Sequence, residues 1–142
     1  MKKQTAKPKH GILKGDINLL KPNEKRAVEF LLDLGIDVKI IPPSRERKTP
    51  DFWIEHQRRE LKTPEGKSPH NIEHAFKKAA KQAEHIIFDA RKSPKTDVVF
   101  VNEVVKALQS SATVKDVWII LKSGELKKIS RREARKLARK EA

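Results

Sequence analysis

The sequence predicts a single α/β domain of the mixed α+β kind, with helices packed on a central mixed sheet. Short runs rich in β-branched and aromatic residues alternate with longer segments in which apolar residues recur every three or four positions. Proline and glycine separate these segments. The chain has 142 residues, which suits one domain, and it lacks cysteine, which excludes disulfides and thiolate metal sites.

The first half of the chain is expected to hold one helix and three strands. The helix begins at Pro22 and ends near Gly35, because Ala27, Leu31 and Leu34 recur at helical spacing. The strands are expected at 37–41, 51–55 and 58–63, the last two forming a hairpin around His56 and Gln57.

A long helix over 71–90 is expected next, because Ile72, Phe76, Ala79 and Ile86 lie on one helical stripe. The sequence then predicts a strand at 97–101, a helix at 102–108, strands at 116–121 and 125–129, and a basic helix from 130 onward. Ser130 and Glu133 have the spacing of a capping box at the start of that last helix.

Charge is the clearest bulk property of the chain. Lysine and arginine number 33 against 19 acidic residues, a net charge of +14, which attracts polyanions. Nucleic acid is the first partner that this charge favours; anionic membrane surface, a ribosome-associated role and a merely solubilising surface are alternatives. No apolar run approaches the roughly 20 residues that span a bilayer, and the N-terminus lacks the apolar core of a secretory signal, so we expect a cytoplasmic protein without a membrane partner.

These properties suggest three regions: a flexible basic arm at 1–20, a folded domain at 21–129 and a basic helix at 130–142. Lysine and arginine on such a helix add affinity for phosphates without reading sequence. The residues expected to bind nucleic acid there are Arg131, Arg132, Arg135, Lys136 and Arg139.

Two carboxylates and a lysine are expected to converge on the hairpin. With a loop centred on His56 and Gln57, Asp51 would lie opposite Lys62, and Trp53 opposite Glu60. Alternate residues share a face of a strand, so Asp51, Glu60 and Lys62 would project from the same face.

That set of side chains suits phosphodiester hydrolysis. Mg²⁺ prefers oxygen ligands and is held by one or two carboxylates, water and substrate phosphate. The ion polarises the phosphoryl group and lowers the pKa of bound water, and a nearby lysine orients that water or stabilises developing charge. Mg²⁺ or Mn²⁺ is therefore the expected cofactor, with Zn²⁺ as an alternative.

Two further residues are candidates for the same site. Glu24 projects from the first helix toward the expected sheet, where a carboxylate is costly unless it is paired or bound to metal. The simpler interpretation is that the helix dipole favours an acid at this position. Gln82 is expected on the inner side of the long helix, either as a group that orients a ligand or as a solvated edge position.

At this point the residues resemble a known family. Pro50-Asp51, followed by Glu60-Leu61-Lys62, is similar to the PD-(D/E)xK nuclease signature. The ordered set from Glu24 to Gln82 resembles the C-terminal tRNase domain of contact-dependent growth inhibition toxins (CdiA), over about residues 22–121.

The resemblance implies a restriction-endonuclease-like core over 21–129, a divalent metal and cleavage of tRNA. Asp51 and Glu60 would be metal ligands, Lys62 the catalytic lysine and Glu24 the helix-borne acid. RNA is then favoured over DNA as substrate, and a toxin would need an immunity or antitoxin protein as partner. A free-standing intracellular or mobile-element nuclease is the alternative to a toxin.

Two rival functions stay open at the level of sequence. A non-catalytic module that binds nucleic acid would keep the same charges as an ordinary cross-strand cluster. A metal-independent RNase would instead depend on histidines such as His70 and His74, which we expect to be solvated. Trp53 would stack a base or lie in the core, and the core is the favoured expectation for it and for Trp118.

Overall fold

The computed structural model describes residues 10–46 and 48–141, and the side chains of 139–141 are not described. The chain divides into two compact units, Met1–Arg58 and Arg59–Ala142, here called the N-terminal and C-terminal units. Within the described part of the chain, no helix is both long and apolar enough to cross a membrane.

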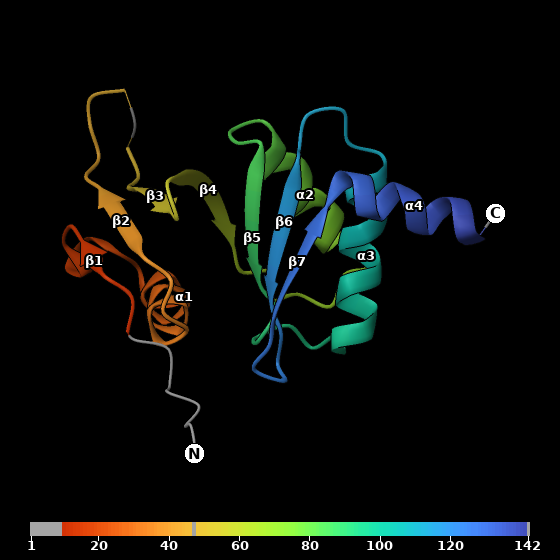
Figure 1. Cartoon of the computed structure of the whole chain (residues 1–142), viewed down its shortest axis with the longest axis horizontal. Coiled ribbons are helices and arrows are strands. Elements are labelled where there is room, and N and C mark those ends of the chain that lie inside the picture. The colour runs from red at the N-terminus through yellow and green to blue at the C-terminus, as the bar shows by residue number, and fades with distance from the viewer. Residues whose placement is uncertain (1–9, 47, 142) are drawn as a thin grey trace, which may run out of the picture. The chain divides into compact units, whose positions relative to one another are not determined.

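The N-terminal unit is a small sheet with one helix. Strand β1 pairs in parallel with β2, and β2 pairs antiparallel with β3, so β2 is central. Figure 1 shows α1 beside this sheet. The elements are β1 (Leu13–Lys14), the short 3-10 helix η1 (Ile17–Leu19), α1 (Pro22–Asp33), β2 (Val38–Ile41) and β3 (Asp51–Ile54).

The first predicted helix is confirmed, and so is the strand that follows it. Glu24 caps α1, because its Oε1 accepts the Lys21 backbone N–H at 2.8 Å. Gly35 follows the helix with φ 84°, a conformation that glycine adopts without strain. The core of this unit consists of Ala27, Val28, Leu31 and Leu32 of α1 and Val38, Ile40, Phe52 and Ile54 of the sheet.

Part of the segment expected to be a flexible arm, residues 1–20, forms regular secondary structure. Residues 1–9 lie outside the described residues, but residues 10–20 include β1 and η1. The backbone N–H of Gly11 donates to the Leu32 carbonyl at 2.7 Å, and that of Val38 donates to the Ile12 carbonyl at 3.0 Å. These backbone hydrogen bonds hold a polar, lysine-bearing segment that hydrophobic patterning alone does not identify.

The hairpin turn lies one residue earlier than expected. Glu55 and His56 both have positive φ, 51° and 73°, which identifies them as the two turn residues in place of His56 and Gln57. Strand β3 ends at Ile54, and β4 (Gln57–Lys62) begins directly after the turn.

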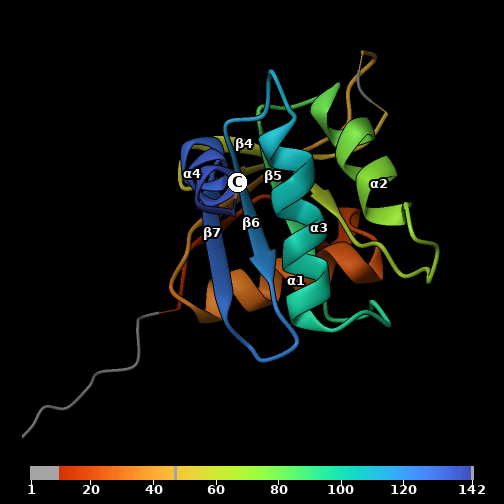
Figure 2. The same cartoon turned by 90° about the vertical axis from the view of Figure 1, so that its right-hand side faces the viewer.

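The C-terminal unit has a four-stranded mixed sheet in the order β4-β5-β6-β7. The β4–β5 and β5–β6 pairs are parallel, and β7 pairs antiparallel with β6. Figure 2 shows α2 and α3 on one face of β5 and β6. The remaining elements are α2 (Asn71–Ala80), β5 (His85–Asp89), α3 (Asp97–Gln109), β6 (Asp116–Ile120), β7 (Leu126–Ser130) and α4 (Arg131–Glu141).

Aromatic side chains fill the space between this sheet and its helices. Phe88 of β5 lies between Phe76 of α2 and Phe100 of α3, with ring centroids 6.4 and 5.9 Å apart. All three are buried in one cluster with Ile86, Val117, Ile119 and Ala134. Mixed sheets with helices packed on them confirm the predicted fold class.

Two elements of this unit differ from the prediction. The helix expected over 71–90 ends at Ala80, and residues 85–89 form β5. Residues 97–101, expected to be a strand, open α3. Thr96 caps that helix by accepting the Val99 N–H at 3.2 Å, and Phe100, Val104 and Leu108 bury a helical stripe. Tertiary burial overrides the β preference of the Val-Val-Phe-Val run.

Candidate active site and basic surfaces

Asp51 is a buried carboxylate in the N-terminal unit. It opens β3, and its Oδ2 lies 3.2 Å from Nε of Arg58. The aspartate side chain is almost buried, whereas that of Arg58 is about a third exposed. A buried carboxylate is stable only with such a partner, so the ion pair accounts for a charge at the first position of an apolar strand.

Glu60 and Lys62 lie on one face of β4. They are two residues apart on one strand, so their side chains share a face, and Lys62 Nζ is 3.7 Å from Glu60 Oε2. Glu60 pairs in register with Ile86, and Lys62 with Phe88, both of which face the helical core. The two charged groups therefore project to the side of this sheet that carries α2 and α3, and both keep partial exposure.

The other two predicted site residues take different positions. One carboxylate oxygen of Glu24 accepts the hydrogen bond that caps α1. Gln82 does not lie on the inner face of a helix, because α2 ends at Ala80; it is exposed in the connection to β5. The predicted position of Gln82 on a helix is therefore wrong, because the apolar stripe of α2 ends with that helix at Ala80.

The donor chemistry of Asp51 and Glu60 fits Mg²⁺ or Mn²⁺, which prefer carboxylate oxygens and keep several water ligands. Among residues 10–46 and 48–141, no group of three or more His, Cys, Asp or Glu side chains is arranged to hold a metal ion. An ion bound through these residues would depend on water and substrate phosphate for most of its coordination.

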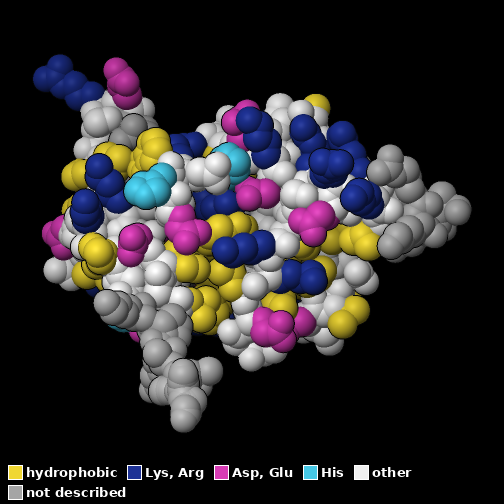
Figure 3. Space-filling view, in the orientation of Figure 1, with side chains coloured by type: hydrophobic (Ala, Val, Ile, Leu, Met, Phe, Trp, Pro, Cys, Tyr) yellow, Lys and Arg dark blue, Asp and Glu magenta, His cyan; other side chains and the backbone are white. Residues whose placement is uncertain are grey.

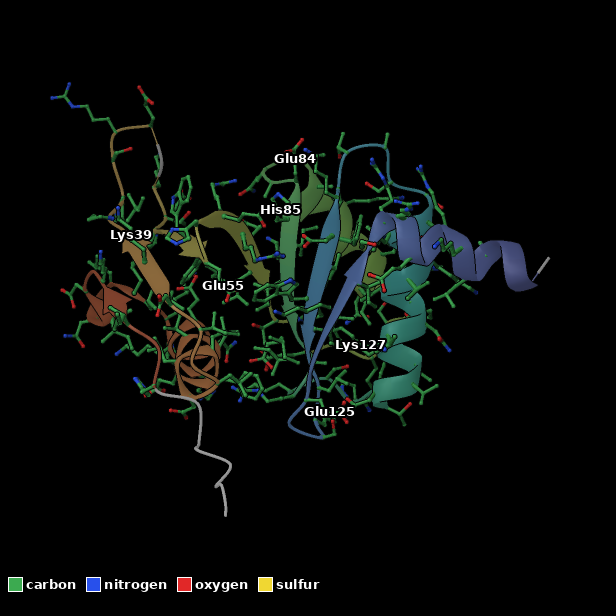
Figure 4. The ribbon with its side chains drawn as sticks, viewed as in Figure 1. Lys39, Glu55, Glu84, His85, Glu125 and Lys127 are labelled. Atoms are coloured by element: carbon green, nitrogen blue, oxygen red, sulfur yellow. The ribbon has the colours of Figure 1, made fainter. Side chains whose placement is uncertain are left out.

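A partly buried ion-pair network in the C-terminal unit was not predicted from the sequence. Asp116, at the start of β6, accepts hydrogen bonds from Arg59 Nη1 and Nη2 at 3.1 and 2.9 Å. Nδ1 of His85 lies 2.8 Å from the same carboxylate, and Figure 4 shows His85 at the start of β5. The three residues are dispersed along the sequence, and only the strand register, which sets His85 beside Asp116, brings them together.

Trp118 packs next to this network. The Arg59 guanidinium lies 4.0 Å from the Trp118 ring centroid, and Lys128 Nζ lies 4.2 Å from it. Cations at these distances are attracted by an indole face. Trp118 is 5% exposed, which confirms its predicted core position, whereas Trp53 is 37% exposed and its expected core position is wrong.

The start of α4 carries a basic depression on the surface. It is lined by Lys115, Ser130, Arg131, Arg132 and Arg135. Figure 3 shows Lys and Arg side chains gathered near the base of α4. Ser130 and Glu133 form the predicted capping box, since Ser130 Oγ accepts the Glu133 N–H and Glu133 Oε1 accepts the Ser130 N–H, both at 3.0 Å.

Two of these arginines also hold α4 on α3. Arg135 donates to the carbonyls of Gln109 and Ser111, and Arg131 donates to that of Ser111. The Gln109 carbonyl is the last of α3 and the Ser111 carbonyl lies just past its C-cap, so neither has a partner in the helix and the arginines satisfy both. Lys136 is exposed, and the side chain of Arg139 lies outside the described residues.

Comparison with known proteins identifies the class of this domain. The profile of the contact-dependent growth inhibition CdiA C-terminal domain matches residues 48–126, more than half of the chain. The chain belongs to this family of toxin domains. The matched stretch contains Asp51, Glu60 and Lys62 and ends before α4.

A solved structure has a similar fold. The chain is similar to one from the CdiA-CT/CdiI toxin and immunity complex of Burkholderia pseudomallei, with 21% identity and a TM-score of 0.68. The similarity covers 84% of this chain and 99% of that chain. At this identity the likeness establishes the fold. No curated protein matches the sequence.

Proposed function

We propose that this CdiA C-terminal domain is a metal-dependent endonuclease that hydrolyses nucleic acid, with tRNA or other RNA favoured over DNA. The observation that carries the proposal is the pattern Pro50-Asp51 with Glu60-Leu61-Lys62, which lies inside the stretch that the family profile matches. The net charge of +14 supports a polyanionic substrate.

Contacts within each unit support this use of the three residues. In the N-terminal unit Asp51 contacts Arg58, and in the C-terminal unit Glu60 contacts Lys62. Each carboxylate therefore has a cation within 4 Å in its own unit.

The proposed mechanism assigns one role to each group. Asp51 and Glu60 would hold Mg²⁺ or Mn²⁺, with Zn²⁺ as an alternative, and Glu24 would act as a further acid through its second carboxylate oxygen. The ion would supply a water of lowered pKa and polarise the phosphoryl group. Lys62 would orient the attacking water or stabilise the charge that develops on phosphorus. Gln82 would orient a substrate phosphate.

The basic depression at the start of α4 would hold the substrate backbone. Arg131, Arg132 and Arg135 supply cations there. Lys136 and Arg139 are the other residues of α4 proposed to bind nucleic acid. Such contacts add affinity that falls with salt and carries no sequence information. As a toxin, the domain would act in the cytoplasm of the target cell, and an immunity protein would be its protein partner.

A second candidate is a non-catalytic module that binds nucleic acid on the same fold. Its supporting observation is that Asp51 and Glu60 each have a cation nearby, Arg58 at 3.2 Å and Lys62 at 3.7 Å. Ordinary charge clusters on strands have the same composition. This candidate predicts binding without hydrolysis.

Cleavage assays with matched variants separate the two candidates. Total tRNA, plasmid DNA and linear DNA are incubated with the protein in Mg²⁺, Mn²⁺, Zn²⁺ or EDTA. We expect metal-dependent cleavage that is lost in Asp51→Asn and Lys62→Ala and kept in the control Lys106→Ala, whose lysine is exposed on α3. Cleavage in EDTA that is lost on replacing His70 or His74 would indicate a metal-independent RNase. Binding without cleavage in every metal would establish the non-catalytic module.

A further inference from the structure

An exposed tryptophan stands on the open face of the N-terminal sheet. Phe52 and Ile54 of β3 point into the core, so Trp53, which lies between them, points to the opposite face and is 37% exposed. Large exposed aromatic side chains are costly to leave in water and are typical of binding surfaces.

Two lysines continue the row from the tryptophan across this face. Trp53 pairs in register with Lys39 of β2, and Lys39 pairs with Lys14 of β1. Cross-strand partners share a face, so the three side chains form one row across the sheet. Figure 3 shows Lys and Arg, hydrophobic and histidine side chains close together over this unit, and Figure 4 labels Lys39 on β2.

The row lies in a groove formed entirely by the N-terminal unit. Ile12, Ile41 and His56 contribute to its lining beside Trp53 and the two lysines. Two acids, Asp37 and Glu55, also line the groove. The Asp37 carboxylate accepts the Ile12 N–H at 2.7 Å, and Glu55 lies in the hairpin turn, so both acids oppose an anion in the groove and Glu55 is the one without a structural role there.

An aromatic face beside lysines suits an unpaired nucleotide. Every base offers a π-face for stacking, and the adjoining phosphates need cations. Sequence-tolerant recognition of RNA uses this combination on loops, bulges and ends, where bases are free of the duplex. A base inside a duplex is already stacked and presents no face to Trp53.

The groove continues toward the proposed catalytic carboxylate. Asp51 and Trp53 are alternate residues of β3 and share one face, and Ile41 pairs with Asp51 as Lys39 pairs with Trp53. Two residues of a strand span roughly 7 Å. A base on Trp53 would therefore belong to a nucleotide close to a phosphate at Asp51.

We propose that Trp53, with Lys14 and Lys39, is a stacking platform that selects unpaired nucleotides of RNA beside the bond to be cut. The inference rests on the proposed nuclease function for its biological meaning. It predicts that the domain binds single-stranded or looped RNA in preference to duplex RNA of the same length. Trp53 is then a binding residue, and hydrolysis itself is left to Asp51, Glu60 and Lys62.

Binding is measured in EDTA, so that hydrolysis does not enter the result. Fluorescence anisotropy of a labelled single-stranded 12-mer RNA and of a blunt 12-base-pair RNA duplex gives the two affinities. The variants are Trp53→Ala, Trp53→Phe, Lys39→Ala and Glu55→Gln, with Lys106→Ala as the matched charge control. Circular dichroism checks that each variant is folded.

We expect Trp53→Ala to weaken binding of the single strand by roughly 5- to 100-fold, the range for loss of one stacked base, with little change for the duplex. Trp53→Phe should restore most of the affinity, and Glu55→Gln should increase it slightly. Lys39→Ala should weaken binding more than Lys106→Ala does.

An unchanged single-strand affinity in Trp53→Ala would overturn the proposal, and so would an equal loss for single strand and duplex. The first result would show that Trp53 does not stack on RNA, and the second would describe a general cationic surface. These outcomes are independent of the cleavage assays, because a domain that never cuts RNA would still show or lack the Trp53-dependent preference for single strands.

Discussion

Arg59 and Asp116 form a two-point ion pair in the C-terminal unit, with Nη1–Oδ1 and Nη2–Oδ2 distances of 3.1 and 2.9 Å. The arginine side chain is 2% exposed. Its guanidinium has therefore lost most of its water, and the carboxylate compensates for that loss. His85 hydrogen-bonds the same carboxylate, so one aspartate links β4, β5 and β6.

Removal of the Asp116 charge should destabilise the protein strongly. Asp116→Asn leaves the buried Arg59 without its anion, and breaking a buried pair costs about 3 kcal/mol or more. Urea denaturation followed by circular dichroism measures the change in the free energy of unfolding. The control is Glu84→Gln, which removes the exposed ion pair with Lys115 and should cost less than about 1 kcal/mol. Equal effects of the two changes would show that burial of Arg59 is unimportant.

The Asp116 network should also make stability depend on acid pH. Burial raises the pKa of the Asp116 carboxyl, but hydrogen bonds and charges from Arg59 and His85 outweigh it and hold the pKa below its ordinary value of 3.8. A lowered pKa means stabilisation that is present above pH 3.8 and lost as the pH falls through the lower folded value. The difference between the urea midpoints of wild type and Asp116→Asn should be largest at pH 5 and shrink as the pH falls below 3.8; a constant difference would contradict the assignment.

Arg58 should compete with a metal ion for Asp51. Its Nε lies 3.2 Å from Asp51 Oδ2, an oxygen that a metal ligand would need. If Asp51 is a ligand, Arg58→Ala should lower the Mn²⁺ concentration that gives half-maximal cleavage, because the cation no longer occupies the carboxylate. Metal titrations of the cleavage rate test this, with Lys106→Ala as the control. An unchanged titration midpoint would contradict the role of Asp51 as a metal ligand.

Thr96 should set the start of α3. Its hydroxyl accepts the Val99 N–H, so Thr96→Ala removes the cap and should cost about 1 kcal/mol, whereas Thr96→Ser should cost little. Thermal unfolding of the three proteins measures both effects. Equal midpoints for the alanine and serine variants would show that the cap contributes nothing.

Two arginines of the basic depression should differ in their effect on stability. Arg132 is exposed, and its replacement by alanine should weaken binding of nucleic acid and reduce the salt dependence of log K by about 0.7–0.9, with stability unchanged. Arg135→Ala should also lower stability by about 1 kcal/mol, because Arg135 hydrogen-bonds the last carbonyl of α3, that of Gln109, and the carbonyl of Ser111 just beyond it. Salt titrations of binding and urea denaturation distinguish the two effects. A loss of stability in Arg132→Ala would contradict this division.

Local signals were enough to predict some elements and the candidate residues. Pro22 and Gly35 delimit α1, and the run at 116–121 is β6. The pattern of Asp51, Glu60 and Lys62 lies within twelve residues, so the sequence itself contains the candidate site.

Long-range packing explains what the sequence left undetermined. Residues 85–89 continue a helical stripe of apolar residues, yet they pair with β4 and β6 and form a buried strand. The apolar run at 97–101 has strand character, and the Thr96 cap with the packing of Phe100 makes it helical. Tryptophan in a strand is usually a core residue, and only the register of β3 places Trp53 on the open face of the sheet.

Arg131 and Arg135 contribute both to the basic surface of α4 and to its packing against α3. Their guanidiniums close the end of α3, and Ala134 between them is part of the core. A truncation before α4 would expose the carbonyls that these arginines satisfy and would remove Ala134 from the core. Loss of nucleic-acid binding in the shortened protein would then reflect a loss of folding as well as a loss of charge. Charge substitutions that leave α4 in place are therefore the way to test whether α4 binds the substrate.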